Sequence, residues 1–361
     1  MAKPLNPART PTIADVARTA AVGKTSVSRY LNGETAVLSE PLRTRIERAI
    51  EALGYRPSQM ARALRQGRTR MVGMLVADLS NPYTVEIMRG VERACGQYGY
   101  MPLLCHAANQ LELEKRYLDL LQTYRVEGMI INPVGMPRNS LAGLIASGTP
   151  TVLVDRRDTT LDCDVVGLDN SDAARRLAEH LLASGFQHVF YVTAPFDEVS
   201  SRRERKMALE RHLHAGGARC QVLVVQDDGP AAFDRLLAPV FACCARARSA
   251  VVAGNGQTML HIALAVARQR ERERGAAAPA LGMATFDEPD WIPLDASGIT
   301  TLRQPTLDIG CSAVECLHAR IEGSRAEAID KRFRAELTVR ASTHAPRALE
   351  ATRRTQPVSH V

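Results

Sequence analysis

Residues 12–33 read TIADVARTAAVGKTSVSRYLNG and contain two short helical patterns on either side of a break. In the first pattern, apolar residues recur at helical spacing behind Thr12, a residue type that often caps helices. In the second, Val27 and Leu31 are four residues apart and therefore lie on one helix face. The break at residues 21–23 is short enough to be a tight turn.

A third helical pattern runs from about Ser39 to Gly54, a residue that often ends a helix. Its apolar residues are spaced so that they can close a small core against the first two helices. Two short helices joined by a tight turn and closed by a third predict a helix-turn-helix domain.

The positive charge of the chain is concentrated in the same region. The whole chain carries a net charge of +7, and residues 1–70 hold 13 Lys and Arg but only 5 Asp and Glu. A basic segment joined to a nearly neutral body is typical of a nucleic-acid-binding domain attached to a regulatory or catalytic domain. On charge alone, a basic solvated tail is the alternative.

Residues 12–64 resemble the DNA-binding headpiece of bacterial transcriptional regulators of the LacI/GalR type. The resemblance rests on TIADVA, AVGKTSVSRYLNGE and LSEPLRTRIERAIEALGYRPSQMARAL. It implies that the second helix lies in the major groove of double-stranded operator DNA. Two residues depart from the family pattern, since Ala21 stands where the turn usually has Gly and Gly23 where the cap usually has Ser.

The resemblance also implies which side chains contact DNA. They are Thr12, Lys24, Thr25, Ser26, Ser28, Arg29 and Asn32. Lys24 and Arg29 suit the paired acceptors of guanine, and Thr25 offers a hydroxyl or a methyl group. Ser26 and Ser28 are better placed for phosphate. For Thr25 and Ser26, capping of the helix is an equally good interpretation.

Residues 57–64 are similar to the hinge helix of the same family. Such a short helix is unstable alone, and in the family two copies pair on operator DNA and insert a Leu into the minor groove. The matching residue is Leu64, which without the resemblance would be interpreted as a core residue. We therefore divide this part into a headpiece, residues 1–56, and a hinge helix with linker, residues 57–70.

From Met71 the chain alternates continuous apolar strands with amphipathic helices. This pattern predicts an α/β fold with parallel sheets that are covered on both faces. About ten strands are too many for one compact sheet of this kind, so we expect two similar lobes with a ligand cleft between them.

Polar residues follow the strands of this region where they end, which is where open α/β sheets bind ligands. They are Asp78, Asn81, Tyr83, Asp155, Arg156, Asp169, Asn170, Asn255 and Asp287. Each alone is as well explained by a turn or a helix cap. Their recurrence at five strand ends favours a polar, hydroxyl-rich ligand.

Residues 71–343 resemble the two-lobed, periplasmic-binding-protein-like core of the same regulators, through VGMLVADLSNPY, VEGMIINP, VLVDR, VVGLDN, AGNG and ITTLRQP. The resemblance implies a core that binds a sugar or related metabolite and dimerises. The effector-binding arginine of the family matches Arg205, its cleft Asn matches Asn255, and its cleft Asp matches Asp287. Arg202 is the alternative to Arg205, because Ala208-Leu209 replaces the usual Gly-aromatic pair.

The arginines indicate an acidic effector. Arg202 and Arg205 lie three residues apart on one helix face, and Arg156 adds charge. Guanidinium groups bind carboxylates through two parallel hydrogen bonds. Trp291 is expected either to stack on a sugar or to fill the junction of the lobes.

The segments SRYLNGE, SSRRER and FDEPDWIPLDASGIT are similar to the 2-ketogluconate-responsive repressors of the family. They imply a sugar-acid effector, with a neutral sugar or a purine as the alternative.

These observations predict a homodimeric repressor that a small-molecule effector releases from a palindromic operator. An effector that acts as corepressor, and pairing of dimers into tetramers, are left open. The rivals from other classes are a sugar-binding transport protein and an α/β enzyme. The first residues lack the apolar run of a secretory signal, and the chain lacks a P-loop, a nucleophile elbow and a dinucleotide fingerprint.

The sequence further predicts a cytoplasmic protein that acts without a membrane, a metal or a cofactor. No apolar run approaches the roughly 18 residues of a membrane span. The cysteines show no metal-ligand spacing. Residues 344–361 have little apolar periodicity and are expected to be disordered.

Overall fold

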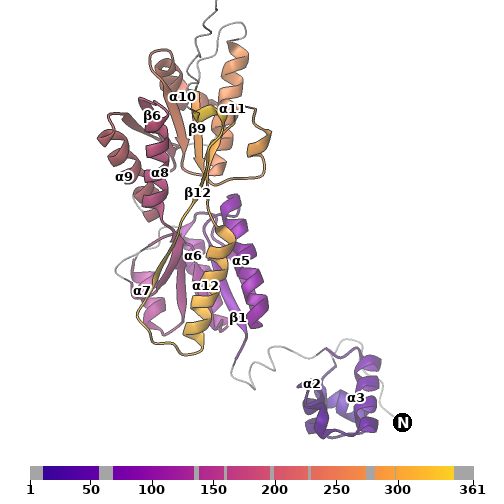
Figure 1. The fold of residues 1–361 in the computed structure, drawn as a ribbon. Coiled ribbons are helices and arrows are strands. Elements are labelled where there is room, and N and C mark those ends of the chain that lie inside the picture. Colours follow the sequence, from indigo (N-terminus) through magenta and orange to yellow (C-terminus); the bar gives the residue numbers. More distant parts are fainter. Residues whose placement is uncertain are drawn as a thin grey trace, which may run out of the picture. The chain divides into compact units, whose positions relative to one another are not determined.

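The computed structural model describes residues 11–56, 68–133, 138–157, 161–195, 199–226, 229–273, 281–296 and 298–344 (Figure 1). The chain divides into two compact units, Met1–Arg70 and Met71–Val361. The predicted hinge helix with Leu64, and residues 345–361 of the predicted tail, lie outside the described residues.

The first unit is a three-helix domain made of α1 (Ile13–Thr19), α2 (Lys24–Leu31) and α3 (Glu40–Leu53), with the short 3-10 turn η1 (Thr35–Val37) between α2 and α3. Val16, Val27 and Ile46, one from each helix, are fully buried and form the centre of its core. The predicted helix-turn-helix is therefore confirmed, with helix ends close to the predicted ones.

The turn between α1 and α2 is held by Arg45 of α3. Ala21 has a φ of 50°, in the left-handed region that costs a residue with a side chain about 1–2 kcal/mol. The Arg45 guanidinium donates to the carbonyl of Ala20 at 2.6 and 3.0 Å and to that of Ala21 at 2.6 Å. A cation at the carboxyl end of a helix is also favoured by the helix dipole, so Arg45 offsets the strain of a turn that lacks Gly.

The second unit contains two six-stranded sheets, and we name the halves built on them the N lobe and the C lobe. The sheet of the N lobe is parallel throughout. Its strands are, in sheet order, β11 (Asp330–Phe333), β5 (Asp164–Leu168), β4 (Thr151–Val154), β3 (Gly128–Ile131), β1 (Met71–Val76) and β2 (Met101–His106). Helices α5 (Pro82–Tyr98) and α12 (Thr306–Ile321) cover one face, and α6 (Leu111–Thr123) and α7 (Arg138–Ala146) cover the other (Figure 1).

The sheet of the C lobe is parallel except for β12, which runs antiparallel to β10 at one edge. Its strands are β12 (Glu336–Thr338), β10 (Thr300–Arg303), β9 (Leu281–Phe286), β8 (Ser249–Ala253), β6 (His188–Thr193) and β7 (Arg219–Val224). Helices α8 (Asn170–Ala183) and α9 (Ser200–Ala215) cover one face. Helices α10 (Pro230–Cys244) and α11 (Gly256–Arg272) cover the other. The 3-10 turns η2 (Ile292–Leu294) and η3 (Ala341–Thr343) complete the lobe.

The chain crosses between the lobes three times, after β5, after β10 and between β11 and β12. Three short crossings leave each lobe with its own sheet and core, so the lobes can move about these segments. The predicted α/β architecture with two parallel-dominated lobes is confirmed. None of the helices in the described part of the chain has the length and apolarity that a bilayer crossing requires.

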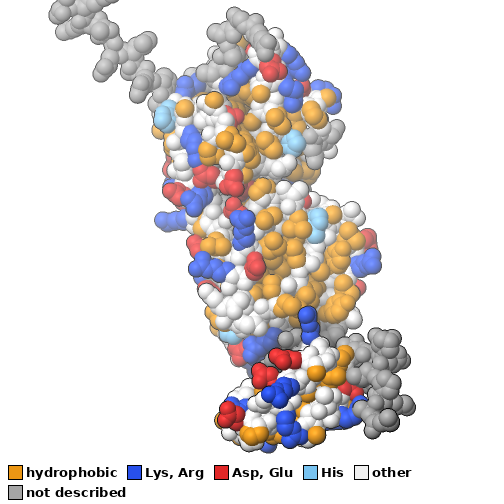
Figure 2. All heavy atoms as spheres, turned by 90° about the vertical axis from the view of Figure 1, so that its right-hand side faces the viewer, with side chains coloured by type: hydrophobic (Ala, Val, Ile, Leu, Met, Phe, Trp, Pro, Cys, Tyr) orange, Lys and Arg blue, Asp and Glu red, His pale blue; other side chains and the backbone are white. Residues whose placement is uncertain are grey.

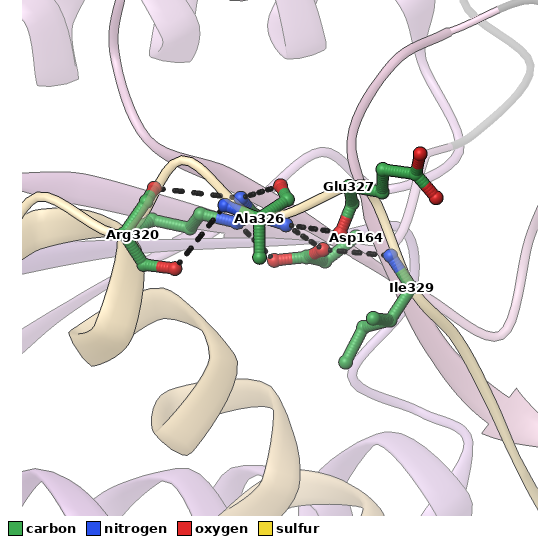
Figure 3. Close-up of polar contacts among 6 residues, drawn as sticks. Asp164, Arg320, Ala326, Glu327 and Ile329 are labelled. Atoms are coloured by element: carbon green, nitrogen blue, oxygen red, sulfur yellow. Dashed lines mark hydrogen bonds and ion pairs between the residues drawn. The ribbon is translucent and has the colours of Figure 1, made fainter.

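The connection between α12 and β11, which precedes the third crossing, is anchored to the N lobe by a buried carboxylate (Figure 3). Arg320, in the last turn of α12, donates to both oxygens of Asp164 at 2.7 and 2.8 Å. The same guanidinium donates to the carbonyl oxygens of Ala326 and Glu327, and the amide of Ile329 donates to Asp164 at 3.0 Å. These bonds place the segment that leads into β11 beside β5.

Candidate functional site

The outer surface of α2 presents three of the predicted DNA contacts. Lys24, Thr25 and Arg29 are exposed, whereas Val27 is buried in the core of the domain. Arg29 lies 3.9 Å from Glu34, and both side chains are exposed, so this pair contributes little and does not hold the guanidinium. The surface is therefore basic, accessible and carried by a rigid helix.

The other predicted DNA contacts are less exposed or take part in helix caps. Gly23 caps α2 and no side chain caps it, so the alternative in which Thr25 or Ser26 is a capping residue is not realised. Thr12 donates to Asp15 from its hydroxyl at 2.6 Å and from its amide at 2.9 Å, which forms a capping box at α1. Ser26 and Ser28 are half-buried, and Asn32 is exposed at the end of α2.

In the second unit a cavity of about 550 Å³ lies between the N lobe and the C lobe. Eight of the nine predicted effector-binding residues line it: Asp78, Asn81, Tyr83, Arg156, Arg202, Arg205, Asn255 and Asp287. They come together because the strands of both sheets point their carboxyl ends at the space between the lobes.

Trp291 is the exception, and its placement corrects one of the two expectations for it. The ring does not line the cavity, and packs instead against the C-lobe core beside η2. Stacking on a sugar is therefore not the role that the structure gives it. The aromatic pair at the cavity is instead Phe233 with His261, whose rings stack 5.0 Å apart.

Arg205 is buried and held on three sides. Its Nε donates to Asn170 at 2.7 Å, and Nη1 donates to the carbonyl of Gly254 at 2.7 Å. The guanidinium also lies over the ring of Phe286, 4.3 Å from its centre. An arginine fixed in this way presents its remaining N–H groups to the cavity in one orientation.

Arg156 and Arg202 lie on opposite sides of the cavity. Arg156 follows β4 of the N lobe, and Arg202 lies in the first turn of α9 of the C lobe. Burial and, to a smaller extent, the positive charge of Arg202 together lower the pKa of Arg156 to about 10. Burial also lowers the pKa of Arg202, with the charge of Arg205 adding to the effect.

Asp287 and Asp155 hold strained positions at the ends of strands. Their φ angles are 76° and 66°. Asp287 accepts hydrogen bonds from the amide of Gly256 at 3.2 Å and from the side chain of Gln304, and burial raises the pKa of the Asp287 carboxyl. Asp155 accepts from the hydroxyl of Ser201 at 3.1 Å, which joins the two lobes across the cavity. Left-handed backbone at non-glycine residues clusters at functional sites.

Several polar side chains of the cavity were not predicted. They are Asn109, Asn132, Ser201, Gln226, Gln257, His261 and Gln304. Most precede or begin helices or lie in loops where the sequence carries no periodic signal. Gln304 could have been found, because it lies directly after β10 on the second crossing.

Four buried polar atoms of the cavity have no hydrogen-bond partner within the described ranges: the hydroxyl of Tyr83, Oδ1 of Asp155, Nε of Arg156 and Oε1 of Gln304. Burial holds the pKa of Tyr83 well above its ordinary value, so the hydroxyl stays protonated and can donate. Buried polar atoms normally find a partner in protein, water or ligand. Together with three arginines, these groups suit a ligand that has many hydroxyl groups and carries a negative charge.

Comparison with known families matches both units of the chain. Residues 12–58 match the model described as bacterial regulatory proteins, lacI family. Residues 69–326 match periplasmic binding proteins and the sugar binding domain of the LacI family.

Among curated proteins, the chain is 44% identical over 338 residues to the HTH-type transcriptional regulator PtxS of Pseudomonas aeruginosa, covering 92% of this chain and 96% of that protein. It is 41% identical to PtxS of Pseudomonas plecoglossicida, with 95% and 99% covered. It is 34% identical to the transcriptional regulator KdgR of Bacillus subtilis, with 87% and 92% covered.

Among solved structures, the Lac repressor dimer bound to operator and the anti-inducer ONPF is similar with a TM-score of 0.79. It is 21% identical, and the match covers 93% of this chain and all of that one. This likeness concerns the fold.

Proposed function

Since the chain belongs to the LacI family, we propose that it is a homodimeric repressor that a sugar acid such as 2-ketogluconate releases from a palindromic operator. As a member of this family with a helix-turn-helix domain, it is a DNA-binding transcriptional regulator. The observation that carries the effector proposal is the cavity between the lobes, which three arginines line.

The proposed recognition of operator DNA depends on α2. Lys24, Thr25 and Arg29 are exposed together on this helix, and a helix that is inserted in the major groove reads bases with such side chains. A dimer with two-fold symmetry presents two such helices to two half-sites, so the proposed operator is palindromic.

The dimer is supported by apolar side chains on the surface of the core. β2 is an edge strand of the N-lobe sheet and exposes Met101 and Leu104. Leu294 of the C lobe is 85% exposed. Figure 2 shows hydrophobic side chains gathered on one face of the core. Exposed edge strands and apolar patches are costly in a monomer and typical of an interface, here with a second copy of this chain.

The effector is proposed to be a sugar acid because the cavity combines hydroxyl-binding amides with guanidinium groups. Binding of a ligand to both lobes favours the closed cleft, and closure changes how the two headpieces of the dimer are held on DNA. Such coupling between two sites is typically about 1–3 kcal/mol. In this proposal the protein acts in the cytoplasm, where bacterial operators are. It binds its effector without converting it to a product.

Selection of binding sites from a random duplex library tests whether the protein binds a palindromic operator as a dimer. We expect palindromic sites whose half-sites are separated by whole helical turns. Sites without two-fold symmetry would contradict the dimer.

Calorimetric titration with 2-ketogluconate, gluconate, glucose and hypoxanthine tests whether the effector is a sugar acid. We expect binding of a sugar acid alone, and weaker operator binding in its presence. Binding of glucose or hypoxanthine alone would contradict the effector class, and tighter operator binding with a sugar acid would reverse the proposed sign.

A further inference from the structure

Two arginines face each other across the interlobe cavity from separate lobes. Arg156 belongs to the N lobe, directly after β4, and Arg202 belongs to the C lobe, on α9. They lie close enough for the charge of one to lower the pKa of the other. Two like charges therefore flank the cleft, and their repulsion opposes closure.

The hydrogen bonds that these arginines make leave their charges unpaired. Arg156 donates from Nη1 to the carbonyl of Pro133, and Arg202 donates from Nη1 to the carbonyl of Pro195 at 2.9 Å. The Nε of Arg156 is buried and makes no hydrogen bond to any described residue. Within the same ranges, neither guanidinium forms an ion pair with a carboxylate. Both side chains are half-buried, and a partly desolvated charge without a partner carries a cost that a bound anion would remove.

The carboxylates of the cavity are bound to other groups. Asp78 accepts from the amide and the hydroxyl of Ser80, both at 2.8 Å. Asp155 accepts from Ser201 through Oδ2, while its buried Oδ1 has no hydrogen-bond partner among the described residues, and Asp287 accepts from Gly256 and Gln304. The negative charge of Asp155 raises the pKa of both arginines and so reduces the positive potential of the cavity, but within the described residues no carboxylate forms an ion pair with either guanidinium.

Arg205 differs from both, because Asn170, Gly254 and Phe286 hold its guanidinium within one lobe. It reads the ligand from the C lobe alone, and its contacts do not depend on how far the lobes are apart. Arg156 and Arg202, which lack such supports, give an anion one partner on each side of the cleft.

We propose that Arg156 and Arg202 form a clamp in which one carboxylate of the effector bridges the two lobes, so that the charge of the effector drives closure of the cleft. This inference rests on the proposed sugar-acid effector and assigns its carboxylate to these two residues. In the empty protein the arginines repel each other, and in the complex the same charges attract a common anion. A neutral sugar of the same shape would occupy the cavity without removing the repulsion.

Titration of the full-length protein with 2-ketogluconate and with its methyl ester tests the clamp, because the ester keeps the sugar and removes the charge. We expect Arg156→Gln and Arg202→Gln each to weaken binding of 2-ketogluconate by about 30-fold or more. Binding of the ester should stay within about threefold of wild type in both. The double variant should lose less than the product of the two single losses, because both residues act on one group.

Closure is measured separately by hydrogen exchange of the crossing segments around residues 303–306 and 333–336. We expect 2-ketogluconate to protect these amides in the wild type, and saturating 2-ketogluconate to protect them less in Arg202→Gln. Arg203→Gln, the exposed neighbour on α9, is the matched control and should behave as wild type in both measurements. Equal protection in wild type and Arg202→Gln would overturn the link between charge and closure.

Operator binding by each variant is the control for correct folding. The conservative variants Arg156→Lys and Arg202→Lys are a second control: they keep the charge but lose the paired N–H groups, so we expect intermediate losses of 2-ketogluconate binding. If the wild type binds 2-ketogluconate and neither Gln variant weakens this binding by more than threefold, the proposed clamp is wrong. The proposed function is then unaffected. Failure of the wild type to bind either 2-ketogluconate or gluconate would overturn both.

Discussion

Asn170 positions Arg205: its side-chain oxygen accepts a hydrogen bond from Arg205 Nε at 2.7 Å, and both residues are buried. The bond joins the first residue of α8 to α9, two helices that pack on the same face of the C-lobe sheet. Asn170 follows β5, where the sequence predicts a polar residue facing a ligand. In the structure Asn170 does not line the cavity and is bonded to the arginine instead.

Replacement of Asn170 by Ala leaves Arg205 Nε without its acceptor in a buried site. We expect about tenfold weaker effector binding, because an unsatisfied buried hydrogen-bonding group costs about 1–3 kcal/mol. Binding to operator DNA should change little, since the residue lies in the second unit. Titration calorimetry and operator binding measure the two effects. Arg175→Gln, on an exposed part of the same helix, is the control, and an equal loss there would point to a general defect of α8.

Substitution of Lys24 or Arg29 by Ala tests whether α2 reads bases. Each variant should lose about 1–3 kcal/mol of binding to the operator and much less to unrelated DNA, because bidentate contacts to bases carry the discrimination. Arg48→Ala, which removes an exposed charge from α3, should weaken binding to both DNAs alike if it has any effect. Equal losses on both DNAs for Lys24→Ala would reduce that residue to a phosphate contact.

The predictability of this molecule from its sequence follows the strength of its periodic patterns. β1, β6 and β9 are continuous apolar runs, and the strands that the sequence predicts at Met71–Ala77, His188–Thr193 and Leu281–Phe286 match them to within one residue, because burial on both faces leaves that signature. α10 was not predicted, since PAAFDRLLAPVFACC is apolar on most faces and has Pro239 inside the helix. β11 was not predicted either, because DKRF is largely exposed and contains no apolar alternation.

The cleft was more predictable than the roles of its residues. The ends of parallel strands converge by topology, so Asp78, Arg156 and Asp287 could be found from strand ends alone. The cap interpretation is confirmed for Asn81 and Asn255, which accept bonds from Tyr83 N at 3.1 Å and Thr258 N at 2.8 Å, and both residues also line the cavity, where the proposed ligand contact stays a prediction. Trp291 could not be placed, since the path of the chain around η2 depends on tertiary packing.

Ala21→Gly should stabilise the headpiece by about 1 kcal/mol. The φ of 50° strains alanine but not glycine, and the gain from relieved strain exceeds the added chain entropy. Arg45→Met should have the opposite effect, also about 1 kcal/mol, because three hydrogen bonds to Ala20 and Ala21 are lost to solvent. Hydrogen exchange of the α1–α3 amides in the full chain measures both changes. Slower exchange in Arg45→Met would contradict the role of Arg45 as the anchor of the turn.

Asp287 makes the stability of the core depend on pH. Burial raises the pKa of its carboxyl above the ordinary 3.8, so the folded state binds the proton more tightly than the unfolded state does. This contribution to stability is present below the unfolded pKa and is lost as pH rises through the folded pKa. Asp287→Asn lacks this titration, so its thermal midpoint relative to wild type should rise from acid toward neutral pH. A constant difference across that range would show that the carboxyl does not titrate as its burial implies.

The ion pair between Arg320 and Asp164 should decide whether β11 stays at the edge of the N-lobe sheet. Asp164 is 2% exposed, and without the guanidinium it would be a buried charge with only the Ile329 amide as a partner among the residues named at this site. Arg320→Met should therefore destabilise the fold by about 3 kcal/mol. The double variant Asp164→Asn/Arg320→Met should recover part of the loss, because the unpaired charge is gone. Denaturant unfolding of the full chain measures both variants against the wild type. The same guanidinium also holds the carbonyls of Ala326 and Glu327, and both variants lose these contacts. We therefore expect faster hydrogen exchange in β11 than in the wild type for the single and for the double variant. Recovery of wild-type protection in β11 would show that the carbonyl contacts do not place the strand.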